Sequence, residues 1–167
     1  MKKGATTKEH FANLDILEQA FAVRAAYLIN ATSVALAKAG KSADQETFAV
    51  AKNKMTKAHF HYISLHLFLN TIRKHDFKDE RIRGWMLLLA RIYALDILIK
   101  DSAACYDSGF FGVDSTVYMR QALAEVVDEI RPQMLSLVES FYVPDSQIPS
   151  NIGNSYGDIY EAQLEWA

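Results

Sequence analysis

Apolar residues recur along this chain at steps of three and four over long stretches, with polar residues between them. Such a period is typical of α-helices, and no segment shows the alternation expected of a strand. Glycine and proline interrupt the pattern three times within the first 143 residues. The pattern therefore predicts four long helices, which begin after Asn13, at Ser42, between Asp76 and Asp79, and at Asp114 or Ser115.

The first two predicted helices have clear local signals. The first should run from after Asn13 to about Ala39, with Gly40 as its left-handed cap. The second opens with a capping box, in which Ser42 and Gln45 satisfy free backbone donors. Its apolar residues form two rows with a seven-residue repeat, the spacing of a bundle seam. The expected core rows are Leu14, Leu17, Phe21, Leu28 and Ala35 in the first helix, and Phe48, Met55, Tyr62, Leu69, Ala51, Ala58, Leu65 and Ile72 in the second.

The third and fourth predicted helices differ in continuity. The third should continue unbroken to Tyr106, because Ser108 and Gly109 are its first stop signals. The fourth contains Pro132, which lacks an amide hydrogen and collides with the carbonyl four residues earlier, so we expect a bend between Ile130 and Met134. The expected core residues are Ile82, Trp85, Leu89, Ile92, Ile99, Ala103 and Tyr106 in the third helix, and Leu123, Val127, Ile130, Met134, Leu137 and Phe141 in the fourth.

These helices predict an all-α fold, an up-down four-helix bundle with a C-terminal arm and a short extra helix. We expect a flexible N-terminal segment over residues 1–13, the bundle over 14–143, and an arm with a terminal helix of the same domain over 144–167. The arm is rich in turn-forming residues. Asp158 and Glu161 form a capping pattern for the last helix, which has no stop signal before Ala167, so the sequence looks cut at that end.

Composition narrows the possible partners. Eighteen Lys and Arg against twenty Asp and Glu give a net charge of -2, which offers no electrostatic reason to expect nucleic acid or an anionic membrane. The apolar run from Trp85 to Ala90 is far shorter than the roughly 20 residues that span a bilayer. A single cysteine, Cys105, rules out an intrachain disulfide. We therefore expect an intracellular, water-soluble protein.

Three histidines on the second predicted helix, His59, His61 and His66, raise the question of a metal site. Metal sites in helical bundles use Glu-x-x-His pairs on facing helices, and this sequence contains no such pair. We therefore predict no metal and expect these histidines to flank the core with hydrogen bonds to neighbours. A metal-containing oxidoreductase bundle is disfavoured for the same reason.

Other candidates for chemistry have simpler interpretations. Asp96 occupies a position in the third helix where the pattern predicts an apolar residue, and a buried carboxylate could act as a base. Lys100 follows four residues later, so we favour a partly buried ion pair between the two. Cys105 has no activating partner in the sequence and is assigned to the core. The glycines form no known phosphate-binding loop. The aromatic residues Phe48, Tyr62, Trp85, Tyr93 and Tyr106 are interpreted as bundle core rather than a cofactor site.

Several short motifs, in this order and spacing, resemble the C-terminal helical domain of the peroxisomal acyl-CoA oxidase family. The resemblance runs from about Leu14 to Ala167. The motifs that carry it are Arg24-Ala25-Ala26-Tyr27-Leu28, Ile130-Arg131-Pro132, Leu137-Val138-Glu139-Ser140-Phe141, Pro144-Asp145, Gly157-Asp158-Ile159-Tyr160-Glu161 and Glu165-Trp166-Ala167.

The resemblance implies a flavin enzyme. The family oxidises fatty acyl-CoA to trans-2-enoyl-CoA with FAD, passes the electrons to O2 to give H2O2, and opens peroxisomal β-oxidation. It implies a homodimer and peroxisomal localisation, although no peroxisomal targeting signal is seen in this sequence. No residue here matches the family's catalytic glutamate, so no catalytic residue is assigned, and the isolated chain is predicted to be inactive.

Two interpretations of the chain remain open. It is either a C-terminal domain of such an oxidase, as a fragment or a separate subunit, or a non-catalytic helical interaction module derived from that domain. In the oxidase, the domain would pack against the domains that hold FAD. The segment expected nearest to them contains Tyr156, Gly157, Asp158, Tyr160 and Glu161, although capping and local packing explain Asp158 and Glu161 equally well.

Overall fold

The computed structural model describes residues 4–40, 48–148, 150, 153 and 157–166. It divides into two compact units, Met1–Ile130 and Arg131–Ala167, which are described separately. The described residues form helices and turns without a strand, and an isolated bridge joins Ala5 to Phe111. The predicted all-α fold is confirmed, while the division into three segments stays a prediction.

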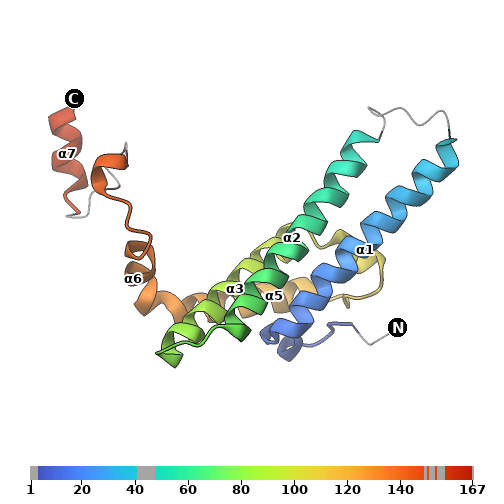
Figure 1. The fold of residues 1–167 in the computed structure, drawn as a ribbon, viewed down its shortest axis with the longest axis horizontal. Helices are drawn as coiled ribbons and strands as arrows, with labels where there is room; N and C mark the ends of the chain where they lie inside the picture. Colours follow the sequence, from blue (N-terminus) through green and yellow to red (C-terminus); the bar gives the residue numbers. More distant parts are fainter. Residues whose placement is uncertain (1–3, 41–47, 149, 151–152, 154–156, 167) are drawn as a thin grey trace. The chain divides into compact units, whose positions relative to one another are not determined.

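The described residues of the first unit form five α-helices and one short 3-10 helix, shown from blue to orange in Figure 1. Helix α1 packs along α2, and α3 packs along α5. Further contacts join α2 to α3 and α1 to both α3 and α4. The elements are η1 (Lys8–Ala12), α1 (Leu14–Ala39), α2 (Ala49–Lys74), α3 (Glu80–Lys100), α4 (Ala103–Asp107) and α5 (Ser115–Ile130).

Local capping determines where α1 and α3 begin. The Asn13 side chain accepts hydrogen bonds from the backbone N–H groups of Asp15 and Ile16 at 2.8 and 3.4 Å. Asp79 does the same for the N–H of Arg81 at 2.9 Å. Gly40 ends α1 with φ +55° but ψ −132°, so it has the expected positive φ without the expected left-handed helical conformation. The capping box predicted at Ser42 lies outside the described residues.

The core of the first unit confirms the predicted rows only in part. Leu17 and Phe21 of α1 and Leu65 and Leu69 of α2 are fully buried as expected. In α3 the fully buried residues are different from the predicted ones, and in α5 only Ile130 belongs to both sets. The buried residues there are Ala90, Ala94, Leu95 and Leu98 in α3, and Met119, Ala122, Val126 and Ile130 in α5.

The reason for this error is that α3 is apolar on more than one side. Leu89, which was predicted to face the core, and Ala94, which does face it, lie about 140° apart around a helix. Small Ala90 and Ala94 allow the neighbouring helices to approach closely, and their modest hydrophobicity gave no signal in the sequence. Leu89 and the other predicted α3 residues are less buried than this small-residue side.

The third predicted helix is not continuous. Helix α3 ends at Lys100, Asp101 takes the non-helical φ and ψ of −145° and 69°, and the separate helix α4 follows. Ala103, expected on the core side, is exposed, while Ala104 and Cys105 are buried. The prediction of one helix to Tyr106 was therefore wrong, because the break is stabilised by contacts that Asp101 makes with α1.

The N-terminal segment is part of the first unit. Ala5 and Phe11 are fully buried, and the ring of Phe11 packs edge-on against Phe111 with centroids 5.6 Å apart. Lys8 forms an ion pair with Glu125 of α5 at 2.5 Å. Residues 4–12 therefore pack against the helices, while the flexibility expected of residues 1–13 stays a prediction.

The predicted bend at Pro132 coincides with the boundary between the two units. Helix α5 ends at Ile130, a 3-10 turn covers Arg131–Gln133, and α6 runs over Met134–Glu139. The second unit also contains a 3-10 turn, Asp145–Gln147, and helix α7, Ile159–Trp166. Met134 and Phe141, expected in the bundle core, are exposed.

Among the described helices, only α1 is long and apolar enough to cross a membrane by length and composition. The sequence analysis did not single out this helix. A core helix meets the same criterion, and α1 packs against α2, α3 and α4 with a fully buried arginine at its centre. This observation is therefore weak evidence for a membrane.

Candidate functional site

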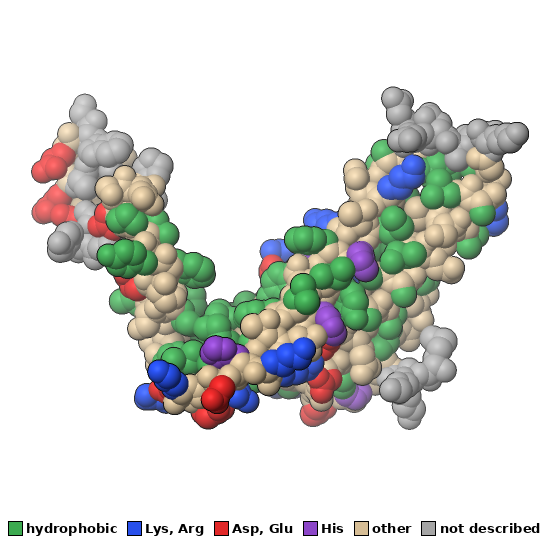
Figure 2. Space-filling model, in the orientation of Figure 1, with side chains coloured by type: hydrophobic (Ala, Val, Ile, Leu, Met, Phe, Trp, Pro, Cys, Tyr) green, Lys and Arg blue, Asp and Glu red, His purple; other side chains and the backbone are tan. Residues whose placement is uncertain are grey.

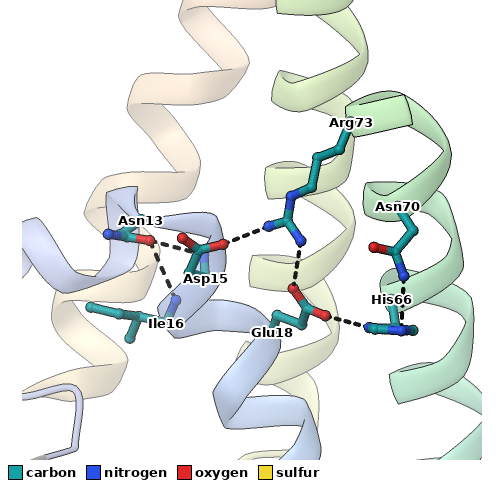
Figure 3. Close-up of polar contacts among 7 residues, drawn as sticks. All are labelled: Asn13, Asp15, Ile16, Glu18, His66, Asn70 and Arg73. Carbon is teal, nitrogen blue, oxygen red and sulfur yellow. Dashed lines mark hydrogen bonds and ion pairs between the residues drawn. The ribbon is translucent and has the colours of Figure 1, made fainter. Parts of the chain in front are cut away.

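A cluster of charged and polar side chains joins α1 to α2 on the first unit (Figure 3). Glu18 from α1 bonds His66 Nδ1 at 2.6 Å and accepts a hydrogen bond from Arg73 at 3.4 Å. Arg73 also donates to Asp15 at 2.5 Å. The carboxylates therefore come from the first turns of α1, and their partners come from the second half of α2.

The geometry fixes the proton positions on His66. A carboxylate only accepts hydrogen bonds, so Nδ1 of His66 carries the hydrogen that faces Glu18. Nε2 then accepts from the Asn70 amide at 2.8 Å. Both ring nitrogens are used within the cluster, which suits a role in joining the helices better than proton transfer to a ligand.

A second polar cluster surrounds Arg24, whose side chain is fully buried. Its Nη2 pairs with the Asp101 carboxylate, and its Nη1 lies 3.3 Å from Nδ1 of His61. Burial, with Arg24 and Lys57 as further causes, lowers the pKa of His61, so a neutral ring can accept the hydrogen bond. Arg24 thereby connects α1, α2 and the break between α3 and α4.

Two hollows lie beside these clusters on the first unit. One, of about 370 Å³, is lined by Asp15, Glu18, Gln19, Ala22 and Tyr62 between α1 and α2. The other, of about 330 Å³, is mainly apolar and lies between α2 and α3. Its lining residues are Ser64, Leu65, Phe68, Leu89 and Tyr93.

Neither hollow is built to hold FAD. The first presents the carboxylates of Asp15 and Glu18, which would repel a pyrophosphate. The second offers few hydrogen-bond donors, and burial raises the pKa of Tyr93, so its phenol stays neutral. The residues that line the two hollows therefore do not fit the flavin as a resident cofactor, and no reaction step is assigned to them.

The remaining chemical candidates have structural partners. Lys100 pairs with Asp96 at 2.7 Å, as predicted, but both side chains are substantially exposed rather than buried. Cys105 is buried, and burial raises its pKa to about 12, so its thiol stays protonated at neutral pH. His59 is exposed. No group of three or more His, Cys, Asp or Glu residues suited to a metal was found in the part of the chain that is described.

The predicted contact segment lies in the second unit. Tyr156 is outside the described residues. Gly157 has φ +79°, a conformation that favours glycine, and precedes α7. Gly157, Asp158, Tyr160 and Glu161 are exposed, so their role as a contact with other domains stays a proposal.

Sequence reasoning missed both polar clusters. Arg24 left a signal, since it occupies the apolar row of α1 between Phe21 and Leu28, where a cation requires a buried partner. The pairing of Glu18 with His66 and Arg73 gave no signal in the sequence, because it depends on how α1 and α2 are aligned with each other in the fold.

Fold and sites together define the first unit as a helical domain in which the described polar clusters hold helices to one another. Comparison with known proteins identifies the family. A model of the acyl-CoA oxidase family matches residues 13–167, so the chain belongs to that family. The resemblance to the C-terminal helical domain of peroxisomal acyl-CoA oxidases is thus confirmed.

Individual relatives agree with this assignment. Peroxisomal acyl-coenzyme A oxidase 1 of Phascolarctos cinereus is 29% identical over 160 residues, covering 93% of this chain and 24% of the relative. The Homo sapiens protein of the same name is 24% identical over 156 residues, covering 90% of this chain and 23% of that relative. The solved structure of Arabidopsis thaliana acyl-CoA oxidase 1 matches 99% of this chain and 24% of that one, with a TM-score of 0.79 and 22% identity. The chain therefore spans about a quarter of the length of these relatives.

Proposed function

We propose that this chain is the C-terminal helical domain of an FAD-dependent acyl-CoA oxidase, which converts fatty acyl-CoA and O2 to trans-2-enoyl-CoA and H2O2. The family match over residues 13–167 is the observation that carries this proposal. Relatives named as peroxisomal support peroxisomal β-oxidation as the setting. The proposal includes a homodimeric enzyme.

In this proposal the chain contributes packing surface rather than catalytic groups. FAD and acyl-CoA are bound mainly by parts of the oxidase outside this chain, in keeping with the two hollows, which do not suit a flavin. The segment Gly157 to Glu161, with Tyr156, is the proposed contact nearest to those parts. The role of the chain is then to pack against the catalytic domains and to help enclose them.

The decisive experiment compares two purified proteins in a peroxide assay with FAD and a fatty acyl-CoA. The longer oxidase polypeptide that carries this chain should form H2O2 in proportion to the enoyl-CoA produced, because it includes the flavin-binding parts. The 167-residue chain alone should form none and should not bind FAD tightly in a fluorescence titration. Turnover by the short chain, or none by the long polypeptide, would contradict the proposal.

The alternative is a non-catalytic helical assembly module, which the many exposed apolar side chains also suit. An autonomous module should be monomeric or form one defined small oligomer, whereas a detached oxidase domain should self-associate without a fixed stoichiometry through its apolar surface. Light scattering over a concentration series distinguishes the two.

A further inference from the structure

Helix α2 is apolar on two sides. Its core side contains the fully buried Leu65 and Leu69. Roughly 140° around the helix from Leu65 lies Phe60, which is 67% exposed, and Leu67 on the same outer side is 58% exposed. A helix that is apolar on both sides is typically buried on both, and among the described residues of the first unit nothing covers the outer side of α2.

The outer side of α2 is also free of charge over three turns. From residue 60 to residue 71 the outward positions hold Phe60, Ile63, Ser64, Leu67, Phe68 and Thr71. Lys57 and Lys74 follow at its two ends. A charge-free apolar centre with charged residues at its margin is the composition of a protein interface.

The apolar hollow extends this surface from α2 to α3. Ser64 and Phe68 form its α2 side, and Leu89 and Tyr93 form its α3 side. Figure 2 shows hydrophobic side chains that reach the surface along α1 and α2. We call Phe60, Ile63, Leu67 and Phe68, together with this hollow, the outer α2 face. It combines a protruding apolar ridge with a recess that can receive one apolar side chain of a partner.

We propose that the outer α2 face docks an uncharged apolar protein surface of the same acyl-CoA oxidase polypeptide, from the part that lies outside this chain. This inference rests on the proposed function. The chain corresponds to only 24% of the matched oxidase structure, so most of that protein is available to cover the face. Nucleic acid or an anionic lipid surface would require cations at the centre, where the face has none.

Hydroxyl-radical footprinting tests the docking directly, because it reports the solvent access of individual side chains. The isolated chain at low concentration and the longer oxidase polypeptide would be labelled side by side. Labelling of Phe60 and Leu67 should fall several-fold in the oxidase. Val113, which is 95% exposed in the turn between α4 and α5, serves as the internal control and should change little.

Two results would overturn the proposal. Equal labelling of Phe60 and Leu67 in both proteins at low concentration means that no part of the oxidase outside this chain covers the face. Protection that appears in the oxidase only as its concentration rises means that a second copy is the occupant, whereas self-association of the isolated chain alone is expected of a detached oxidase domain. Footprinting does not depend on turnover, so loss of the proposed enzymatic function would appear only in the peroxide assay.

A pair of variants adds an energetic test. Leu67→Glu places a charge in the outer α2 face, and Val113→Glu places one outside it. In the isolated chain both should keep the wild-type melting temperature, because both side chains are exposed. In the oxidase, Leu67→Glu should restore the labelling of Phe60 and lower the melting temperature, whereas Val113→Glu should do neither. Equal behaviour of the two variants in the oxidase would refute docking at this face.

Discussion

The two compact units of this chain contain similar kinds of apolar residues but bury them very differently. The first unit has a contiguous core that joins its N-terminal segment to helices α1, α2, α3, α4 and α5. In the second unit, no described residue is buried. Its exposed large apolar side chains are Met134, Leu135, Val138, Phe141, Tyr142, Val143, Tyr160 and Leu164.

This difference separates a part that has its own driving force for folding from a part that does not. Burial of apolar surface is the main favourable contribution to folding, and short helices such as α6 and α7 are marginal in water without it. The exposed apolar residues of the second unit therefore contribute little to its own stability. The comparison teaches that equal hydrophobicity in sequence does not imply an equal contribution to stability.

The sharpest test truncates one phenylalanine in each unit. Phe21→Ala should destabilise the chain by about 3 to 5 kcal/mol, because it removes a fully buried ring and leaves a cavity. Phe141→Ala should change the stability of the isolated chain by less than about 0.5 kcal/mol, since its side chain is 80% exposed. Urea denaturation followed by circular dichroism measures both, and similar losses would remove the distinction between the units.

The buried charge in the first unit gives an asymmetric pair of variants. Asp101→Ala leaves Arg24 buried without its carboxylate and should cost about 3 kcal/mol. Arg24→Met fills the same space without a charge and leaves Asp101, whose side chain is 50% exposed, free to hydrate. That variant should stay within about 1 kcal/mol of wild type. The denaturation midpoints of the two variants measure these losses. A larger loss of stability for Arg24→Met than for Asp101→Ala would mean that the ion pair itself makes the larger contribution.

The cluster between α1 and α2 should have a smaller effect. Glu18→Gln removes the charge that faces His66 and Arg73 while it keeps the side-chain length. We expect a loss of about 1 to 2 kcal/mol, typical of charge-assisted hydrogen bonds at a partly buried site. The matched control is Arg81→Ala, which breaks an exposed pair within two residues of sequence and should cost much less than Glu18→Gln. Equal losses in thermal denaturation would show that the cluster does not join the helices.

The smallest expected effect concerns pH. The pKa of His61 is lowered in the folded chain, so its contribution to stability is present above its ordinary value of 6.5 and is lost as pH falls through the folded-state pKa. NMR titration should therefore give His61 a lower pKa than in the unfolded chain. His61→Asn should flatten the dependence of stability on pH in the same range, and an ordinary pKa at His61 would contradict its contact with Arg24.

Local sequence alone determined where several elements begin and end. Asn13 and Asp79 cap the helices that follow them, and Pro132 marks the end of a long helix, because a side chain or ring acts there on backbone within one turn. The all-helical class followed from the apolar period in the same way. The resemblance to the oxidase family came from short motifs rather than from physical reasoning.

Tertiary structure decided which side of each helix is buried and where polar groups meet. Ala90 and Ala94 face the core instead of Leu89 because the close approach of neighbouring helices favours small residues there. The break at Asp101 exists because Arg24, on another helix, holds that carboxylate. These outcomes depend on the positions of helices that are distant in sequence, and a helix that is apolar on several sides does not encode its own orientation.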